Sequence, residues 1–315
     1  MSEIKEGPAP ALTETGTVPA GFRCGFVALA GRANVGKSTL MNRIVGAKLS
    51  IVSEVPQTTR FPVRGILHRP GLQIVFIDTP GIHKPRYRMN EGMVRLATRV
   101  LREVDLVAVM VDASEGLGPG DRFAFDLLRQ SRSRCVLVLN KIDVMPKENL
   151  LPQIEEASRT SLFEEIVPVS ALSGENCDRL EAVIAARMPP GPPHFPEDML
   201  TDLPQRQAIA ELIREQVFIQ TRQEVPHASA VMVDLVEKNE KGLVKIHATV
   251  VTDRDSQKGI LIGEGGRMMK AIGTAARHGL EEYLAARVHL SLWVKVKRNW
   301  RDDTSLLRLI GLPVA

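Results

Sequence analysis

The stretch Gly31-Arg32-Ala33-Asn34-Val35-Gly36-Lys37-Ser38 decides the fold, because it matches the pattern GxxxxGK[ST]. It lies between an apolar run at 22–30, expected to be a buried strand, and a helix that opens near Lys37. Backbone N–H groups of such a loop converge on phosphate oxygens, and the helix amino terminus adds favourable partial charge. A glycine-rich turn that matches by chance is the alternative, and this strand-to-helix setting disfavours it. The predicted phosphate-binding residues are Gly31, Arg32, Ala33, Asn34, Val35, Gly36, Lys37, Ser38 and Thr39.

From residue 22 to about 187, short apolar runs alternate with segments of helical period. This alternation is typical of an α/β layer structure with a mostly parallel sheet. Arg69, Pro70 and Gly71 separate two of the runs as a hairpin turn would, so that pair is expected to be antiparallel and the sheet mixed. The predicted strands are 22–30, 63–69, 72–78, 106–112, 135–140 and 166–170.

Asp78-Thr79-Pro80-Gly81 follows the strand predicted at 72–78. The Asp78 carboxylate therefore emerges at the strand's carboxyl end, on the same edge of the sheet as the phosphate loop. There it can reach a metal through water, while the Gly81 N–H can meet a γ-phosphate. The tetrapeptide alone is weak evidence, and its place after a strand strengthens it.

The base-binding end is predicted from Asn140-Lys141-Ile142-Asp143, which ends the strand at 135–140. A carboxylate only accepts hydrogen bonds, so Asp143 can take both bonds that guanine N1–H and its 2-amino group offer, whereas adenine offers no such pair. Ser170, Ala171 and Leu172 would add backbone contacts to the base, although an ordinary strand end explains them equally well. The spacing thus predicts a guanine-nucleotide site that includes Asn140 and Lys141.

Taken in order, these motifs resemble those of translation-factor-type GTPases. The resemblance implies GTP and GDP as ligands, Mg²⁺ as the metal and GTP hydrolysis as the reaction. Lys37 would then hold the β- and γ-phosphates. Gln57-Thr58-Thr59-Arg60 is similar to the first switch segment of that class, so Thr59, with Thr58 as the alternative, would ligate Mg²⁺. The implied metal set is Ser38, Thr59 and Asp78.

Related GTPases often carry a water-orienting glutamine after the glycine equivalent to Gly81, and this chain has Ile82 there. An aliphatic side chain cannot orient water. Either intrinsic hydrolysis is slow, or another charge compensates: in similar GTPases an asparagine at the position of Asn34 ligates K⁺, which makes K⁺ a candidate cofactor. The candidate catalytic residues are Asn34, Lys37, Thr59 and Gly81.

Five prolines within residues 189–196 indicate a stiff spacer, and the element order changes after it. We expect a flexible tail at 1–20, a GTPase domain at 21–188, a linker at 189–204 and a separate α+β domain at 205–315. The second domain should contain helix 205–221, strands 228–237 and 242–252, helices 256–262 and 267–286, and strand 288–297.

Gly263-Glu264-Gly265-Gly266 joins an apolar helix end to a new helix, an arrangement that resembles a type II KH domain, which binds single-stranded RNA. A plain helix–helix turn is the alternative. Residues 254–301 carry ten Lys or Arg against four Asp or Glu, which favours a polyanion. Glu264 departs from the basic residue that many such loops carry, and Arg267 or Lys270 could compensate. The predicted RNA-binding residues are Ile262, Gly263, Glu264, Gly265, Gly266, Arg267, Lys270, Lys295 and Lys297.

Strand 288–297 should have one buried and one cationic face, with Trp293 and Trp300 as core anchors rather than base-stacking residues.

Beyond the first 20 residues the whole chain is similar to the Era-like family of bacterial GTPases with a C-terminal KH domain. That resemblance implies binding near the 3′ end of small-subunit ribosomal RNA and a role in assembling that subunit. The γ-phosphate would order loops around 48–62 and 82–92 and so bias the position of the second domain.

Two other functions stay open: an RNA-binding assembly factor that uses GTP structurally, and a peripheral membrane GTPase. The latter would use the apolar face of residues 91–103, which core packing explains more simply. Three scattered cysteines and no apolar run of about 18 residues favour a cytoplasmic protein, with weak peripheral membrane association at most. We expect a monomer, although the sequence leaves the oligomeric state open.

Overall fold

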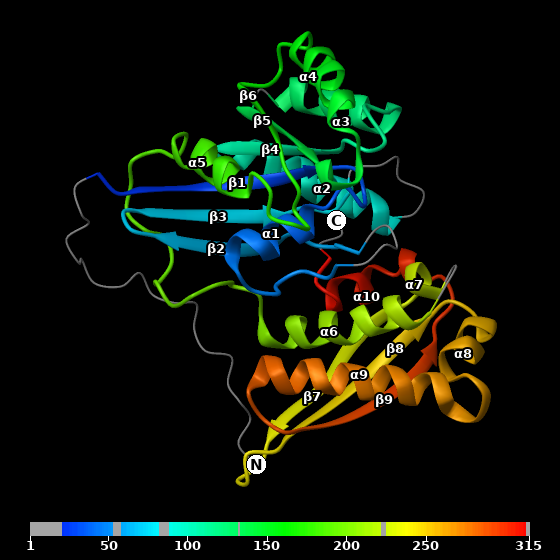
Figure 1. Ribbon diagram of the computed structural model, residues 1–315. Coiled ribbons are helices and arrows are strands. Elements are labelled where there is room, and N and C mark those ends of the chain that lie inside the picture. Colours follow the sequence, from blue (N-terminus) through cyan, green and yellow to red (C-terminus); the bar gives the residue numbers. More distant parts are fainter. Residues whose placement is uncertain (1–20, 53–57, 82–87, 132, 222–224, 313–315) are drawn as a thin grey trace.

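The protein is described by a computed structural model that covers residues 21–52, 58–81, 88–131, 133–221 and 225–312 (Figure 1). It forms two units, one around a six-stranded sheet and one around a three-stranded sheet. The first unit contains β1 (Arg23–Gly31), α1 (Lys37–Val45), β2 (Val63–Arg69), β3 (Leu72–Asp78), α2 (Arg88–Glu103), β4 (Leu106–Asp112), α3 (Pro119–Ser131), β5 (Cys135–Asn140), α4 (Leu150–Ser158), β6 (Glu165–Pro168) and α5 (Cys177–Ala185).

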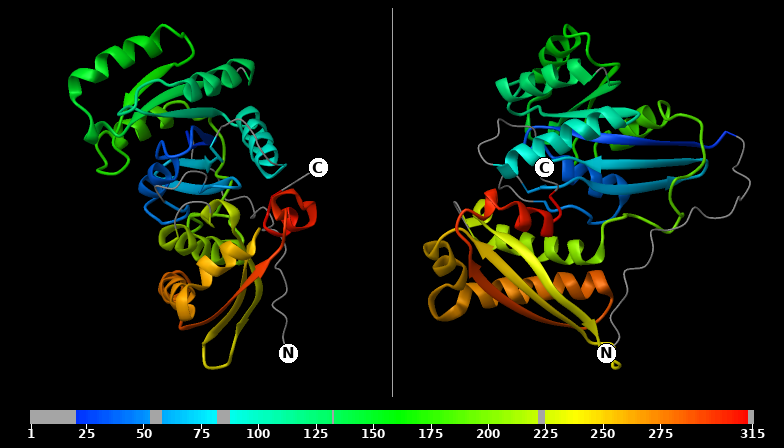
Figure 2. Two further views of the ribbon diagram at one scale, coloured as in Figure 1. Left: turned by 90° about the vertical axis from the view of Figure 1, so that its right-hand side faces the viewer. Right: turned by 180° about the vertical axis from the view of Figure 1, so that it is seen from behind.

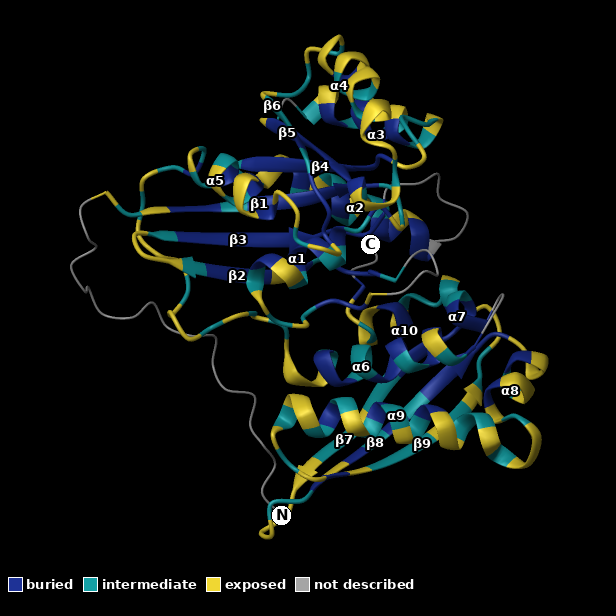
Figure 3. Ribbon diagram, in the orientation of Figure 1, coloured by how far each residue is buried: buried dark blue, intermediate teal, exposed yellow. Residues whose placement is uncertain are grey.

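The large sheet has the order β2-β3-β1-β4-β5-β6. β2 is antiparallel to β3, and the remaining neighbours are parallel. Residues on one side of the strands pack with α1 and α5, and residues on the other side pack with α2, α3 and α4. Burial on both faces explains the continuous apolar runs, and Figure 3 shows the strands as buried along most of their length. The predicted α/β fold with a mixed, mostly parallel sheet is confirmed.

The proline-rich segment lies along the edge of this sheet rather than projecting as a free spacer. The buried Gln73 carboxamide accepts hydrogen bonds from the N–H groups of His194 (2.7 Å) and Phe195 (3.1 Å). Further along, the Ile66 N–H donates to the Leu200 carbonyl at 2.8 Å. The segment therefore covers the otherwise exposed edge strand β2 and delivers the chain to the second unit at a fixed place.

The second unit is built from α6 (Gln205–Gln220), α7 (Val225–Ala228), β7 (Ala230–Lys238), β8 (Val244–Thr252), α8 (Asp255–Ile262), α9 (Arg267–Leu284), β9 (Val288–Val296) and α10 (Thr304–Leu309). β8 is central, antiparallel to β7 and parallel to β9. α6 and α9 pack on the sheet around a common core. The predicted α+β unit of KH type is confirmed, with α7 and α10 as additions that the sequence analysis did not anticipate.

A small apolar cluster joins the two units. Met89 and Met93 of α2 pack in it with Trp300, Leu306 and Leu307. Trp300 begins a short 3-10 turn, η4 (Trp300–Asp302), and its fully buried indole donates to the Ala228 carbonyl at 2.8 Å. α10, drawn in red, lies between the two units in all three views of Figures 1 and 2. The prediction that Trp300 is a core anchor is confirmed, and its core includes both units.

Candidate functional site

The phosphate loop has a backbone that only glycine can adopt at its two ends. Gly31 ends β1 with φ 142°, and Gly36 precedes α1 with φ 97°. A Cβ atom at Gly31 would lie 2.3 Å from the Met110 carbonyl oxygen, and one at Gly36 would lie 2.2 Å from Asn140 Nδ2. The two glycines thus allow the loop to pass close to its neighbours.

The loop opens into a cavity of about 660 Å³ at the carboxyl edge of the large sheet. The cavity is large enough for a nucleotide. It brings together most of the residues predicted from the motifs, although these are far apart in sequence. The predicted residues that line it are Ala33, Asn34, Gly36, Lys37, Ser38, Thr39, Thr59, Gly81, Asn140, Lys141, Asp143 and Ala171.

Five predicted residues do not line the cavity: Gly31, Arg32, Val35, Asp78 and Ser170. The side chain of Arg32 forms an ion pair with Asp121 of α3 at 2.8 Å and another with Glu115, which precedes α3, at 3.0 Å. Its contribution to phosphate binding is therefore limited to its backbone. Gln57 and Ile82, named in the sequence analysis, lie outside the described residues.

Lys37 is buried at the base of the loop. Its Nζ donates to the carbonyls of Gly31 at 3.1 Å and Arg32 at 2.6 Å. Burial lowers the pKa of Lys37 to about 8, and the nearby Asp78 carboxylate opposes that shift. A buried ammonium with two neutral acceptors favours an added anion, as a phosphate group would be.

Three oxygen-bearing side chains from separate elements meet beside Lys37. Ser38 Oγ donates to Asp78 Oδ2 at 2.6 Å, Thr59 Oγ1 donates to the same atom at 3.1 Å, and the two hydroxyls are 3.2 Å apart. Asp78 Oδ1 is buried without a hydrogen-bond partner among the described residues. Hard oxygen ligands and an unsatisfied carboxylate oxygen fit Mg²⁺. Of the two threonines, Thr59 is the one whose hydroxyl reaches this cluster.

At the base-binding end, the Asn140 carboxamide holds two loops together. Its Nδ2 donates to the Val35 carbonyl at 2.7 Å, and its Oδ1 accepts from the Ala171 N–H at 2.9 Å. Asn140 therefore fixes the phosphate loop against the 170–172 turn. Lys141 Nζ pairs with Asp112 at 2.5 Å, which leaves the exposed Asp143 carboxylate at the cavity.

Sequence reasoning missed Val144 at this cavity, and for Leu172 it predicted a backbone contact without a role for the side chain. Both are large apolar side chains that are mostly exposed. They line the cavity, where Val144 follows Asp143 in the sequence and Leu172 follows Ala171. Exposed apolar groups beside a hydrogen-bonding carboxylate suit the flat faces of a purine. Only their positions next to the two base-binding motifs could have indicated them.

The segment 58–60 contacts the second unit directly. Arg214 Nη2 of α6 donates to the Thr58 carbonyl. The buried Arg60 guanidinium donates to the carbonyls of Ser229 at 2.8 Å and Pro226 at 3.4 Å, and lies 5.6 Å from the centroid of the Trp300 ring. Thr59, between these two residues, reaches the metal cluster. One short segment therefore touches both the nucleotide site and the second unit.

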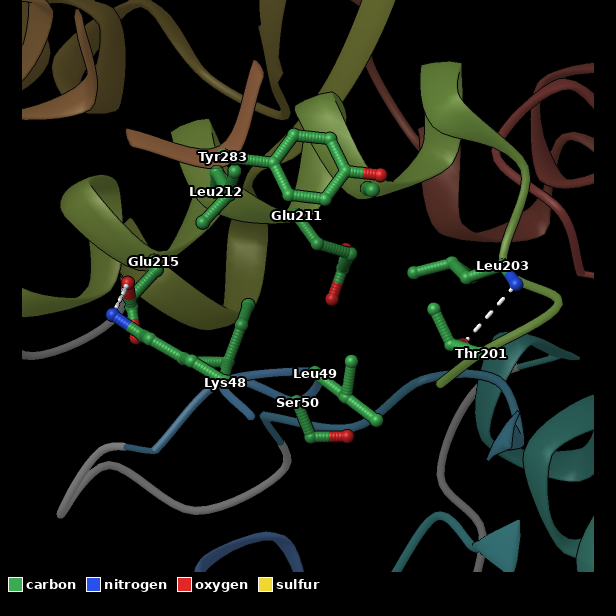
Figure 4. A pocket seen from close by; sticks show the side chains of 11 residues that line it. Lys48, Leu49, Ser50, Thr201, Leu203, Glu211, Leu212, Glu215 and Tyr283 are labelled. Carbon is green, nitrogen blue, oxygen red and sulfur yellow. Dashed lines mark hydrogen bonds and ion pairs between the residues drawn. The ribbon is translucent and has the colours of Figure 1, made fainter. Parts of the chain in front are cut away.

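A second contact lies nearby, between residues 48–51 and α6. Lys48 Nζ pairs with the buried Glu215 carboxylate at 2.7 Å, and Figure 4 shows this pair at one side of a small pocket that also faces Tyr283 and Leu203. The pocket, about 40 Å³, is too small for a ligand larger than a few waters. It marks a joint between the units.

A groove of about 540 Å³ lies on the second unit between α9 and the edge strand β9. The GxxG loop, which forms the 3-10 turn η3 (Glu264–Gly266), opens one end of it. Of the predicted RNA-binding residues, Ile262, Gly266 and Lys270 line the groove, together with Met269 and Arg277. Apolar walls with cations at the rim are what a single strand of nucleic acid requires.

Not all predicted RNA contacts lie in this groove. The Glu264 carboxylate pairs with Arg267 Nη2, so the acidic loop residue is neutralised within its own turn. Gly263, Gly265 and Lys295 are outside the groove lining, and Lys297 Nζ pairs with Asp303 at 2.5 Å. Lys295 is exposed on β9, whereas Lys297 serves to attach η4 and α10.

Trp293 corrects one expectation. It is 50% exposed, lines the groove, and packs edge-on against His247 at 5.2 Å between ring centroids. The prediction of a core anchor is wrong for Trp293, because side chains of β9 alternate between the two faces of the sheet and Trp293 lies on the face opposite Leu292 and Val294, which pack in the core with α6 and α9.

Comparison with known proteins finds a family match in each of the two units. Residues 26–141 match a family described as 50S ribosome-binding GTPase, and residues 224–301 match the KH domain family. The GTPase Era of Heliobacterium modesticaldum is 46% identical over 290 residues, which is 92% of this chain and 97% of the relative. The GTPase Era of Alkaliphilus oremlandii is 46% identical over 291 residues, 92% of this chain and 99% of the relative.

Two solved structures are similar along nearly the same length, and each shares 40% identity over 92% of this chain and 99% of its own. Era in complex with MgGDPNP and nucleotides 1506–1542 of 16S ribosomal RNA superposes with a TM-score of 0.90. A variant of Aquifex aeolicus Era bound to GDP·AlF4⁻ superposes with a TM-score of 0.89. Since relatives of this identity are matched over almost their whole length, the chain belongs to the Era family of GTPases.

Proposed function

We propose that this GTPase binds single-stranded RNA at the 3′ end of the small-subunit ribosomal RNA, in a manner that depends on its nucleotide, and assists assembly of that subunit. The groove between α9 and β9, with Lys270 and Trp293 at its walls, supports RNA binding. The 16S ribosomal RNA fragment in the related Era complex supports the identity of the RNA. We take residues 21–188 as the nucleotide domain, 189–204 as the linker and 205–315 as the RNA-binding domain of a monomer.

In the nucleotide domain, Ser38 and Thr59 would hold Mg²⁺ directly, and Asp78 would hold it through water. Mg²⁺ held by these residues would offset the negative charge that develops during hydrolysis. Lys37 would hold the β- and γ-phosphates, and the Gly81 N–H would meet the γ-phosphate. The Asp143 carboxylate would select guanine. Asn34, which lines the cavity with φ 64°, would place K⁺ beside the phosphates.

The contacts made by residues 58–60 support the proposal that RNA binding depends on the bound nucleotide. Thr59 can follow the γ-phosphate through the metal, while the residues on either side are bonded to the second unit. Burial lowers the pKa of Arg60 to about 9, with the neighbouring Arg214 adding to that shift. A buried cation of this kind is held by its carbonyl partners and the Trp300 ring, so movement of Thr59 displaces contacts of the KH unit.

RNA affinity in two nucleotide states tests the proposal. An oligonucleotide with the 3′-terminal sequence of small-subunit ribosomal RNA is titrated onto the full chain with a GTP analogue and with GDP. Wild type should give two different dissociation constants, and Arg60→Ala should bring their ratio close to one. Arg64→Ala is the matched control, since Arg64 is exposed and pairs with Asp202. Equal constants in wild type would contradict nucleotide dependence.

The membrane alternative has less support. Met93, Ala97 and Leu101, three of the apolar residues of α2 that would contact lipid, are buried, and Met93 and Leu101 belong to the two apolar clusters beside the helix. Among the described residues, no helix has the length and apolar character needed to cross a membrane. The proposal therefore assigns RNA, rather than lipid, as the polyanionic partner.

A further inference from the structure

An arginine outside the nucleotide cavity contacts the turn at the base-binding end. Arg43 lies on α1, further along the helix that Lys37 begins, and is not among the residues that line the cavity. Its Nε donates to the Ala171 carbonyl at 2.6 Å, and its Nη2 donates to the Leu172 carbonyl. The helix that starts at the phosphate loop therefore also contacts the 170–172 turn.

The Arg43 guanidinium is bonded to this turn rather than to an acidic group. Among the described residues it forms no ion pair, so the two carbonyls are its acceptors. Gly174 allows the close approach, because a Cβ atom there would lie 3.0 Å from Arg43 Nη1, and its φ of 95° favours glycine. A planar guanidinium that donates to two successive carbonyls fixes their orientation more strictly than a single donor would.

The peptide between Ala171 and Leu172 is the part of the turn that Arg43 orients. Its oxygen accepts from Arg43, and the preceding Ala171 N–H donates to Asn140 Oδ1 at 2.9 Å. The peptide is trans, so the Leu172 N–H points away from the carbonyl that Arg43 binds. Among the described residues no acceptor takes this N–H, and Leu172 lines the cavity. The turn thus has an unused backbone donor in the cavity that Asp143 also lines.

Hydrogen bonds within the turn do not replace the contacts with Arg43. The Ser173 N–H donates to Ser170 Oγ at 3.0 Å, and the Gly174 N–H donates to the Ser170 carbonyl at 2.8 Å. These bonds set the shape of the turn, but they do not engage the two carbonyls that Arg43 binds. Loss of Arg43 should therefore leave the turn folded and release its orientation at the cavity.

We propose that Arg43 is a positioning residue for guanine recognition, which orients the peptide between Ala171 and Leu172 so that a backbone N–H of the turn donates to the 6-oxo group of the base. Guanine has an acceptor at this position, whereas adenine has an amino donor. A donor that is oriented before the base arrives costs no reordering on binding. This role rests on the guanine site proposed above, in which Asp143 binds the N1–H and the 2-amino group.

The test compares GDP with two analogues, each of which changes one edge position of the base. 6-Thio-GDP carries sulfur, a weak acceptor, in place of the 6-oxo oxygen, and IDP lacks the 2-amino group that Asp143 would bind. Dissociation constants of the full chain are measured by calorimetry with Mg²⁺ for wild type, Arg43→Ala and Arg43→Lys. Wild type should bind both analogues more weakly than GDP.

Arg43→Ala should weaken GDP binding about fivefold, because two hydrogen bonds from an exposed guanidinium are lost. The ratio of the 6-thio-GDP and GDP constants should move close to one, because the turn no longer directs its N–H at the 6-position. The ratio of the IDP and GDP constants should stay as in wild type. Arg43→Lys, which keeps a charged donor, should recover most of the GDP affinity.

Arg129→Ala is the matched control, since Arg129 of α3 is also exposed and donates to a backbone carbonyl, that of Thr160, at 3.2 Å. It should leave all three constants unchanged. Three results would overturn the proposal: unchanged GDP affinity in Arg43→Ala, equal weakening of GDP and 6-thio-GDP in that variant, or the same pattern in Arg129→Ala. Equal IDP and GDP constants in wild type would instead contradict the role of Asp143, and the 6-thio-GDP ratio would still decide the role of Arg43.

Discussion

The nucleotide site and the RNA groove are made in opposite ways. The first is made mostly from backbone groups and buried polar side chains at the ends of parallel strands, and Asn140 locks two of its loops together. The second is an open groove beside an edge strand, with half-exposed Trp293 on its wall. A rigid polar site discriminates between bases sharply, whereas an open apolar groove binds by stacking and charge and discriminates less.

The largest effect should come from the rigid site. Asp143→Asn replaces one of the two acceptor oxygens with a donor, so guanine loses one of its two hydrogen bonds and meets a donor–donor clash there, whereas the C2 carbonyl of xanthine gains a donor. We expect GDP affinity to fall by roughly a hundredfold or more and XDP affinity to rise. Titration of both nucleotides with fluorescent analogues measures this. Equal affinity of the variant for GDP and XDP would show that another group reads the base.

A smaller effect should appear when the cation near the phosphates is exchanged. If Asn34 holds K⁺, replacing K⁺ with Na⁺ should lower the rate of GTP hydrolysis about tenfold, because a cation at this place offsets transition-state charge. Asn34→Ala should remove the difference between the two salts while GDP affinity changes little. Phosphate release at constant ionic strength gives the rates. A rate that is the same in both salts would remove K⁺ from the mechanism.

Part of the difference between the nucleotide site and the RNA groove could be predicted from the sequence. The motifs at 31–38, 78–81 and 140–143 each follow a strand, and parallel strands place their carboxyl ends on one edge, so the cavity could be predicted from spacing. The role of Arg60 could not, because its partners Ser229 and Pro226 are more than 160 residues away and are backbone carbonyls, which carry no sequence signal.

The second unit also has features that the sequence alone could not predict. An alternating strand has two faces, but the sequence does not say which face the helices cover. Trp293 is exposed because it lies on the face opposite Leu292 and Val294, which pack in the core with α6 and α9. Likewise, five prolines predict an extended segment, while its attachment to the sheet depends on Gln73, a single polar residue buried in β3.

The affinity of the open groove for RNA should depend moderately on base stacking against Trp293. Trp293→Ala should weaken binding of single-stranded RNA about fivefold, equivalent to about 1 kcal/mol, because one aromatic platform is lost. Trp293→Phe should restore most of the affinity. The slope of affinity against salt should stay unchanged, since no phosphate contact is removed. Fluorescence anisotropy at several salt concentrations measures both. An unchanged affinity would place the bases elsewhere in the groove.

The smallest effect should come from the acidic residue of the GxxG loop. An unpaired carboxylate beside a phosphate would repel it, and Glu264→Gln would then strengthen RNA binding severalfold. Because Glu264 pairs with Arg267, the substitution also releases a cation that the carboxylate holds in place, and both groups are exposed to water and salt. We therefore expect a change of less than about twofold in RNA affinity. Anisotropy at low and physiological salt measures it, with Glu240→Gln on the β7–β8 turn as the control. A severalfold gain confined to Glu264→Gln would show that the pair opens when RNA enters, and that this loop, unlike the phosphate loop, rearranges to admit its ligand.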